Sequence, residues 1–545
     1  MSAVACSRRE QPTAPAQGPP VKAPAVGTAP TPQAEQSSFA LGKELYANYC
    51  AACHGETGDG IGPAARFLYP KPRNFREGRF RLVSTANRVA SDNDLMRVIT
   101  RGMPGSAMFP FGHLTDVERR ALVAHVRHLA RSGVEQQLRE QLAELGEDVD
   151  PKELAIQVDE LTLPAEPLQL PADWSAITQE SVVRGRQLYV KQACVSCHGE
   201  TGKGDGVQEQ RNDDGTPTRP RDLTRGIFKG GREDLHLYAR TLLGMPGTPM
   251  PSSANLQAGE IADLIHYTQS LSDPSQAAKV EHQRRQVVAS RVGDTLPDEI
   301  PESAWEASQP VQIVVSPLWW RDHADADLRV QALHDGQSLA VRLSWNDAAP
   351  NHDSVRIQDF EDMAAVQWFR GAREPFLGMG GAGAPVEVWV WEADWQADHV
   401  EYADVDTVYP DMAVDLYPLE KPAEGARPHA TQQQPKEFLT GWAAGNLLSD
   451  PTRGLIGNSL QATGFGSLTT LPRVSQSVGA SGKWNSGRWN VVLRRPLQVA
   501  ADAGLPLAPG EKLSIAFAIW DGAARDRNGQ KLVSIWHDLE LSPSE

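Results

Sequence analysis

Two stretches of the same form, Cys50-Ala51-Ala52-Cys53-His54 and Cys194-Val195-Ser196-Cys197-His198, decide how the first half of this chain is read. Their spacing is typical of c-type haem attachment. Cysteines at positions i and i+3 lie on one face of a helical turn, so both thiols can reach one porphyrin. The histidine that follows offers its imidazole to the iron. We therefore expect two covalent haem c groups, held by Cys50, Cys53, Cys194 and Cys197, with His54 and His198 as proximal iron ligands.

The same cysteines could in principle form an all-cysteine zinc site or a redox dithiol. A histidine directly after both pairs is not needed for either role. The two pairs use four of the five cysteines in the 545-residue chain, which leaves almost no thiols for other chemistry. Haem attachment is the better interpretation.

The sequence around these stretches repeats. Gly42-Lys43-Glu44-Leu45-Tyr46 precedes the first stretch, and Gly185-Arg186-Gln187-Leu188-Tyr189 precedes the second. A period of about 145 residues is too long for a solenoid repeat. Each copy closes with apolar residues at helical spacing. The repeat predicts two small helical domains, at residues 38–133 and 178–272.

These two ranges resemble class I cytochrome c domains, in which the distal methionine often lies in a Gly-Thr-x-Met-Pro stretch. Gly247-Thr248-Pro249-Met250-Pro251 fits this pattern, so Met250 is favoured over Met245 as the sixth iron ligand. A thioether is a soft ligand that stabilises ferrous iron and raises the reduction potential.

In the first domain Met108 corresponds to Met250 by the repeat register. Phe109 replaces the proline of the pattern, so Met103 stays an alternative ligand. Histidines could also compete for this position, although we expect them to be surface or core groups: His113, His125 and His128. With histidine and methionine both bound, the iron has no open position, which favours single-electron transfer over bond chemistry. A dihaem peroxidase would need a haem with an open or displaceable site.

The N-terminal residues 1–37 are rich in Pro and Ala and predict a disordered tether. Cys6 follows small residues and resembles a bacterial lipoprotein processing site, while an ordinary cysteine in a disordered tail is the alternative. Because c-type haem is attached outside the bacterial cytoplasm, the resemblance implies a periplasmic protein, with Cys6 as a possible lipid anchor.

Charge and hydropathy narrow the class of partner. The net charge of −16 argues against nucleic-acid binding, which needs a basic face. No apolar stretch approaches the roughly 20 residues of a membrane-spanning helix. Two polar segments are expected to link domains: a helical linker at 134–177 and a second linker at 273–300.

From residue 301 to 545 the pattern changes to strands. Val386-Glu387-Val388-Trp389-Val390-Trp391 is rich in β-branched and aromatic residues, and Asp335-Gly336 between two apolar runs is a hairpin signal. Eight to ten such runs with little helix predict an antiparallel sandwich. The fold class expected for the chain is thus two small all-α cytochrome c domains followed by an all-β antiparallel sandwich domain.

Several short sequence motifs within residues 301–545 resemble those of the haem-binding subunit of ethylbenzene dehydrogenase and its relatives. They are residues 360–369, 378–381, 462–469, 519–523 and 528–534. The resemblance implies a haem b held between a methionine and a lysine. Met379 matches the methionine. The lysine is not placed, and Lys436 and Lys483 are candidates. A lysine ligand must be deprotonated and therefore buried. Without haem b, the domain would be a docking module on the same scaffold.

The resemblance also implies a partner, since such subunits carry electrons from or into a molybdenum enzyme of the dimethyl sulfoxide reductase type. We expect a periplasmic electron carrier with two haem c, and with a haem b where the resemblance of the last domain extends to its cofactor, working between such an oxidoreductase and a respiratory partner. Two other functions compete with this one. The chain could be a dihaem enzyme of peroxidase type, or a protein whose haem-free sandwich binds a ligand or partner.

Overall fold

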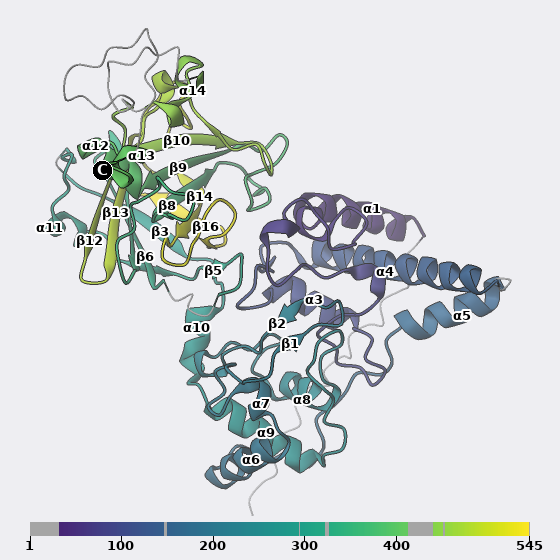
Figure 1. Ribbon diagram of the computed structural model, residues 1–545. Helices are drawn as coiled ribbons and strands as arrows, with labels where there is room; N and C mark the ends of the chain where they lie inside the picture. The colour runs from purple at the N-terminus through teal and green to yellow at the C-terminus, as the bar shows by residue number, and fades with distance from the viewer. Residues whose placement is uncertain are drawn as a thin grey trace, which may run out of the picture.

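The chain folds into two helical domains and a strand-rich domain, which Figure 1 shows arranged around a common centre. The computed structural model describes residues 32–146, 150–293, 295–321, 326–411, 440–450 and 453–543. Cys6, Lys436 and most of the predicted tether lie outside these ranges. Domain 1, domain 2 and domain 3 below denote the parts around Cys50, around Cys194 and after residue 281.

Domain 1 is built on the crossing of its first and last long helices. Gly42 lies at this crossing, where a Cβ atom would stand 2.1 Å from the carbonyl oxygen of Ala121, so only glycine allows the approach. Ser91 and Thr115 cap two helices with reciprocal side-chain and backbone bonds, which satisfies their first N–H groups. The helices are α1 (Pro32–Tyr49), α2 (Ala51–His54), α3 (Asp92–Arg101) and α4 (Asp116–Leu145).

Two of these bounds differ from the sequence-based expectation. Helix α1 begins at Pro32, inside the stretch that we predicted as tether. Helix α4 runs without a break from domain 1 into the predicted helical linker, which continues with α5 (Pro151–Thr162). Leu154 and Val158 of α5 are buried. The segment after domain 1 is thus helical as far as Thr162, and α5 packs on domain 1.

Domain 2 repeats the plan of domain 1. Gly185 takes the place of Gly42, and a Cβ atom there would stand 1.9 Å from the carbonyl oxygen of Asp263. The repeated glycine is thus explained by the helix crossing in both copies. The elements are α6 (Gln179–Lys191), α7 (Val195–His198), β1 (Gln210–Arg211), β2 (Pro217–Thr218), α8 (Asp234–Leu243) and α9 (Ala258–Ser270), with α10 (Ala277–Val280) leading to domain 3.

Domain 3 is a large curved sheet. In the described residues its main path runs β11-β10-β9-β8-β14-β16-β3-β6-β7-β13-β12. Trp391 of β9 packs on Trp489 of β13 at 4.8 Å, so strands far apart along this path meet face to face. The strands are β3 (Gln286–Arg291), β4 (Val311–Ile313), β5 (Ser316–Pro317), β6 (Leu328–His334), β7 (Ser338–Asn346), β8 (Met363–Phe369), β9 (Val386–Glu392), β10 (Gly457–Ala462), β11 (Thr469–Thr470), β12 (Gly479–Asn485), β13 (Arg488–Pro496), β14 (Lys512–Trp520), β15 (Leu532–Val533) and β16 (His537–Leu541).

The predicted strand-rich class of domain 3 is confirmed, but strand β3 shows that the sheet is not purely antiparallel. Strand β3 lies in the range predicted as the second linker, and it pairs in parallel with both β16 and β6. The sheet is therefore mixed, and it begins before residue 301. Val287 and Ala289 of β3 are buried, while the polar residues beside them face outward and hide the strand in the sequence.

Domain 3 buries both faces of its central strands. The inner core holds five tryptophans, among them Trp345, Trp389 and Trp391. The opposite face of β8, β9, β10 and β14 carries a second apolar cluster, here called the outer cluster: Ala365, Phe369, Val386, Val388, Val390, Leu460, Ala462, Ala516, Trp520 and Trp536. Short helices flank the sheet: α11 (Glu302–Trp305), α12 (Ala393–Val400), α13 (Val405–Val408) and α14 (Thr440–Ala443).

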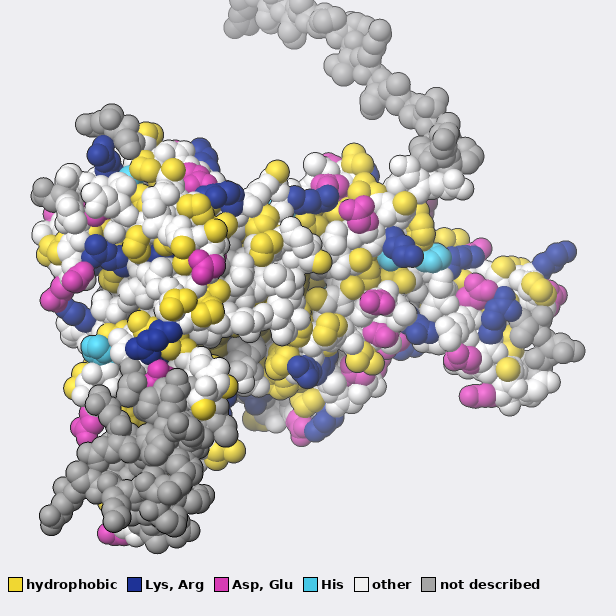
Figure 2. Space-filling model, turned by 90° about the horizontal axis from the view of Figure 1, so that it is seen from above, with side chains coloured by type: hydrophobic (Ala, Val, Ile, Leu, Met, Phe, Trp, Pro, Cys, Tyr) yellow, Lys and Arg dark blue, Asp and Glu magenta, His cyan; other side chains and the backbone are white. Residues whose placement is uncertain are grey.

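The three domains pack directly on one another. Ala239 and Leu243 of α8 in domain 2 belong to the apolar core of domain 1. Figure 2 shows basic and acidic side chains interspersed on the face seen from above, with no single basic region on that face. None of the helices in the described ranges is both long and apolar enough to cross a membrane.

Candidate haem sites

The first Cys-x-x-Cys-His stretch forms one helical turn with its histidine at the end. Cys50 precedes α2 and His54 closes it. The Nδ1 atom of His54 lies 3.0 Å from the carbonyl oxygen of Arg73, and its ring stacks on Phe75 at 4.4 Å. Burial lowers the pKa of His54, which keeps the imidazole neutral. Nδ1 therefore donates to the carbonyl, and Nε2 remains for a metal.

A cavity opens beside this turn, and the predicted iron ligands of domain 1 meet there. Cys50, Cys53 and His54 line it together with Met103 and Met108. Much of the remaining wall is apolar: Leu68, Phe75, Phe80, Leu82, Leu95, Val98, Ile99 and Phe111. Burial raises the pKa of both Cys50 and Cys53 to about 12, as expected for thiols in an apolar wall.

The competing histidines of domain 1 are not among the residues that line this cavity. His125 instead packs between Phe39 and Tyr46, at 5.5 and 5.0 Å between ring centroids. His113 packs against Tyr49. The structure therefore leaves the two methionines as candidates for the distal position.

The methionine loops of the two domains have the same geometry. The N–H of Met103 donates to the carbonyl of Met108 at 2.8 Å, and that of Met245 donates to the carbonyl of Met250 at 3.2 Å. In both loops a hydroxyl side chain also donates to the carbonyl of the first methionine. Met245 is buried in the domain core, which fits a packing role and agrees with the prediction of Met250 as ligand.

The second attachment turn, α7, ends in His198, which is half-buried. Burial, with a smaller effect of the Lys229 charge, lowers the pKa of His198 to about 4. Its Nδ1 atom is buried without a hydrogen-bond partner in the described residues. Cys197 lines a separate cavity with Pro70, Arg221 and Lys229.

Arg221 is a buried cation and Lys229 a half-buried one, and neither makes an ion pair within the described residues. Both line the cavity of domain 1 as well as the cavity beside Cys197. Burial lowers the pKa of Arg221 to about 10 and that of Lys229 well below its usual value. A buried cation needs an anionic partner to be stable. The propionate carboxylates of a haem supply such partners, so the residues present fit the group that the attachment turns predict.

Met379 of domain 3 lies on a strained loop above the outer cluster. Its φ angle is +81°, a backbone conformation that residues other than glycine rarely adopt. The side chain packs against the outer cluster, where Ala365, Ala516 and Ala518 present short side chains. Strain of this kind concentrates at functional sites.

Lys531 is a half-buried lysine at the same cluster, and sequence reasoning did not single it out. Its Nζ atom lies 4.4 Å from the centroid of Trp520, a member of the outer cluster. Burial lowers the pKa of Lys531 to about 8. A neutral amine can ligate iron, so Lys531 and Met379 together fit a haem b. Lys531 lies within the motif at 528–534, which resembles the family. The sequence alone does not show that a lysine beside an Asn-Gly turn is shielded from solvent.

Of the two lysines considered from the sequence, Lys483 does not fit this role. Lys483 is exposed on β12 and forms an ion pair with Glu299. Lys436 lies outside the described residues. Lys483 is neither a member of the outer cluster nor beside it, because its side chain points to solvent.

Comparison with known proteins agrees with this geometry. The family model described as cytochrome c matches residues 39–130 and 182–272, and that described as ethylbenzene dehydrogenase matches residues 302–532. A Haloferax mediterranei protein assigned as a respiratory nitrate reductase haem subunit is 24% identical over 47% of this chain and 72% of its own. The dimethylsulfide dehydrogenase subunit gamma of Rhodovulum sulfidophilum is 26% identical over 46% of this chain and 74% of its own.

Among solved structures, a chain of a reducing HAO-like protein complex from Kuenenia stuttgartiensis is 33% identical and matches with a TM-score of 0.36. The match covers 43% of this chain and 96% of that one. The family matches together span most of the described domains. The protein therefore combines two cytochrome c domains, which bind haem c, with a domain of the ethylbenzene dehydrogenase family, which binds haem b.

Proposed function

We propose that the protein carries single electrons between a molybdenum oxidoreductase of the dimethyl sulfoxide reductase type and a respiratory partner. The observation that carries this proposal is the cavity of domain 1, where His54 faces a loop with two methionines. A haem supplies reversible one-electron chemistry, and its potential is set by its axial ligands and surroundings. An iron with two protein ligands offers no position to a substrate.

The proposed ligand sets combine the sequence prediction for the two haem c groups with the positions of Met379 and Lys531 in domain 3. His54 and Met108 would hold the iron in domain 1, and His198 and Met250 that in domain 2. Met379 and Lys531 would hold the iron in domain 3. The thioether favours ferrous iron, while the burial of Lys531 keeps its amine available for a metal. Each pair thus combines a nitrogen donor with a thioether.

The relatives support an electron-carrying role and leave both directions of flow open. One is assigned to a nitrate reductase, which consumes electrons, and another belongs to a dimethylsulfide dehydrogenase, which releases them. Both matches cover less than half of this chain. The partner enzyme, its substrate and the direction of transfer in this protein therefore belong to the proposal.

We also propose that the protein works in the periplasm, because c-type haem is attached there. Cys6 is the proposed site of a lipid anchor. Labelling with a radioactive fatty acid, with Cys6→Ser as the control, tests this part. Label in the wild type alone supports the anchor, and equal label in both proteins contradicts it.

The electron-carrier role is tested with the purified, haem-loaded protein. Carbon monoxide should bind slowly or not at all to the reduced protein, because each iron already has two protein ligands. A dimethyl sulfoxide reductase-type enzyme that turns over its own substrate should oxidise or reduce all three haems. Rapid carbon monoxide binding with a high-spin spectrum would contradict the proposal and favour an enzyme of peroxidase type.

A further inference from the structure

The cavity of domain 1 is walled by all three domains. Domain 1 supplies the attachment turn with Cys53 and His54, domain 2 supplies Arg221 and Lys229, and domain 3 supplies Phe376. A c-type haem attached to Cys50 and Cys53 is therefore bordered by both neighbouring domains. The order of the domains in the chain does not predict this, because it places domain 2 between the other two.

The wall toward domain 2 is shared by two cavities. Pro70, Arg221 and Lys229 line the cavity of domain 1 and also the cavity beside Cys197. Arg101 of domain 1 fixes this wall by donating to the carbonyl of Lys229 at 2.9 Å. One layer of residues thus separates the haem c cavity of domain 1 from the cavity beside Cys197, one of the two cysteines expected to attach the second haem c.

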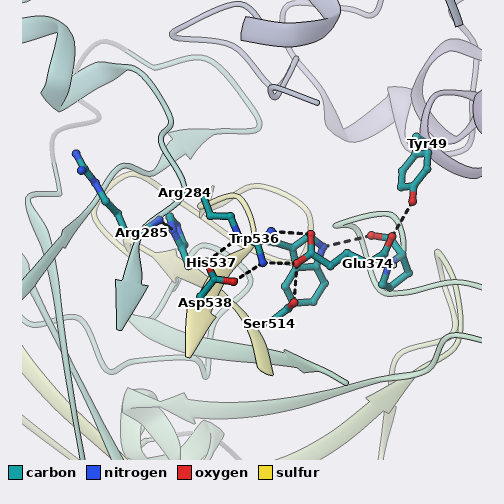
Figure 3. A network of polar contacts seen from close by, with 9 residues as sticks. Tyr49, Arg284, Arg285, Glu374, Ser514, Trp536, His537 and Asp538 are labelled. Carbon is teal, nitrogen blue, oxygen red and sulfur yellow. Dashed lines mark hydrogen bonds and ion pairs between the residues drawn. The ribbon is translucent and has the colours of Figure 1, made fainter. Parts of the chain in front are cut away.

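The wall toward domain 3 is formed by the segment that ends in Met379. Tyr49 donates to the carbonyl of Glu374 at 2.9 Å, and Arg284 binds both the Glu374 and Asp538 carboxylates (Figure 3). Trp536, a member of the outer cluster, donates to the carbonyl of Pro375 at 3.2 Å. These bonds hold the segment between domain 1 and the outer cluster.

Phe376 is the residue of this segment that enters the cavity of domain 1. The next residue, Leu377, accepts a bond from Gln367 at 3.0 Å and packs on the outer cluster, as does Met379. One short stretch of backbone therefore reaches from the haem c cavity of domain 1 to the proposed ligand of haem b.

The second proposed ligand of haem b is also joined to domain 1. The N–H of Tyr69 donates to the carbonyl of Leu318 at 2.9 Å, and the N–H of Leu318 donates to the carbonyl of Lys531 at 3.0 Å. Pro70, the residue after Tyr69, lines the cavity of domain 1. Both ligand segments of domain 3 thus face the same haem c site.

We propose that the haem of domain 1 is the central relay, so that electrons pass between domain 2 and domain 3 only through domain 1. This inference rests on the proposed electron-carrying function. In each step one ferrous iron is oxidised and the next ferric iron is reduced, with no bond or proton transferred. The rival route runs directly from domain 2 to domain 3, where Arg219 stacks on Trp320 at 5.2 Å.

The test injects an electron into domain 2 and follows its arrival at haem b. Val207 is 99% exposed and lines the cavity beside Cys197, so Val207→Cys provides a place for a photoactive ruthenium label. The full, haem-loaded chain also carries Cys6→Ser, which removes the other free thiol. After a laser flash, the absorbance of haem b reports arrival. Phe376→Ala and Trp320→Ala interrupt the two routes separately.

The central relay predicts that Phe376→Ala slows the reduction of haem b several-fold and that Trp320→Ala leaves it unchanged. Both variants must show three haems and wild-type midpoint potentials, and haem reduction in domain 2 must keep its rate. A protein with Cys50→Ser and Cys53→Ser, shown by intact mass to lack the first haem c, should not transfer the electron to haem b.

The opposite pattern, slowing by Trp320→Ala alone, would overturn the inference while leaving the electron-carrying function intact. So would unchanged arrival at haem b in the protein without the first haem c. If the label reduces no haem in the wild type although dithionite reduces all three, both the order and the proposed function fail.

Discussion

Replacing Lys531 with methionine should have opposite effects on stability and on haem binding. Burial lowers the pKa of Lys531 from 10.5 to about 8, a difference that corresponds to about 3 kcal/mol of cost for burying the ammonium form. In protein without haem b, Lys531→Met removes this cost while keeping an unbranched apolar stem. The free energy of unfolding of domain 3 should therefore rise by about 2–3 kcal/mol at pH 7.

The pH dependence gives a second check of the same cause. The folded-state pKa of Lys531 is depressed, so the cost is fully present below about pH 8 and disappears as the pH rises toward 10.5. The advantage of Lys531→Met should therefore shrink over this range. Urea unfolding followed by tryptophan fluorescence reports on domain 3, since all but one of the fourteen tryptophans, Trp174, lie after residue 300.

Haem binding should change in the other direction. Lys531→Met should retain less extractable haem b, or hold it with an altered spectrum, because the nitrogen ligand is lost. Lys483→Met is the matched control, since Lys483 is exposed and its pair with Glu299 contributes little. Wild-type haem b content and spectrum in Lys531→Met, with lowered stability, would refute the reasoning about this residue.

Three further predictions concern buried groups. Arg221→Gln should lower the midpoint potentials of both haem c groups, because a positive charge beside a haem disfavours its oxidised form. Redox titration checks this, with Lys203→Gln, a change at an exposed lysine, as the control. Equal midpoint potentials in the two variants would contradict the prediction. Met108→Ala should abolish the methionine–iron charge-transfer absorption of domain 1 and Met103→Ala should keep it, while the reverse result would assign Met103. Burial, with the nearby Asp362 charge, raises the pKa of Asp347 to about 7, so the free energy of unfolding should fall as the pH rises from about 4 to 7. Asp347→Asn should remove this fall and gain about 2 kcal/mol at pH 8. The same pH dependence of the thermal unfolding midpoint in the wild type and in Asp347→Asn would contradict this prediction.

The local patterns of the sequence predicted the parts of this fold that local chemistry determines. The repeated glycines, Gly42 and Gly185, mark the same helix crossing in both copies. The runs around Val386 and Asp335 became β9 and the β6–β7 hairpin. In each case neighbouring residues carry the whole signal, through periodicity or turn chemistry.

Strand β3 could not be predicted in the same way. Its buried residues, Val287 and Ala289, are few, and both of its partners lie far along the chain. Parallel pairing of this kind depends on contacts that no short window contains. The polar residues around it are typical of a linker, which is how the sequence alone presents it.

The candidate site residues show the same difference between local sequence signals and long-range contacts. The attachment cysteines and their histidines form a short contiguous motif, so each of these residues could be predicted from the sequence. Lys531 and Phe376 owe their roles to burial between distant segments, against Trp520 and in the cavity of domain 1. Nothing in the adjacent sequence distinguishes them from a turn lysine and a loop phenylalanine.

The count of haems in the full chain tests the central claim most directly. Protein expressed with export and haem maturation is measured by pyridine haemochrome, by acid–acetone extraction and by intact mass. The account predicts two covalent haem c groups and one extractable haem b per chain. Fewer than two covalent haems would contradict the assignment of both attachment turns, and two covalent haems with nothing extractable would contradict the haem site of domain 3.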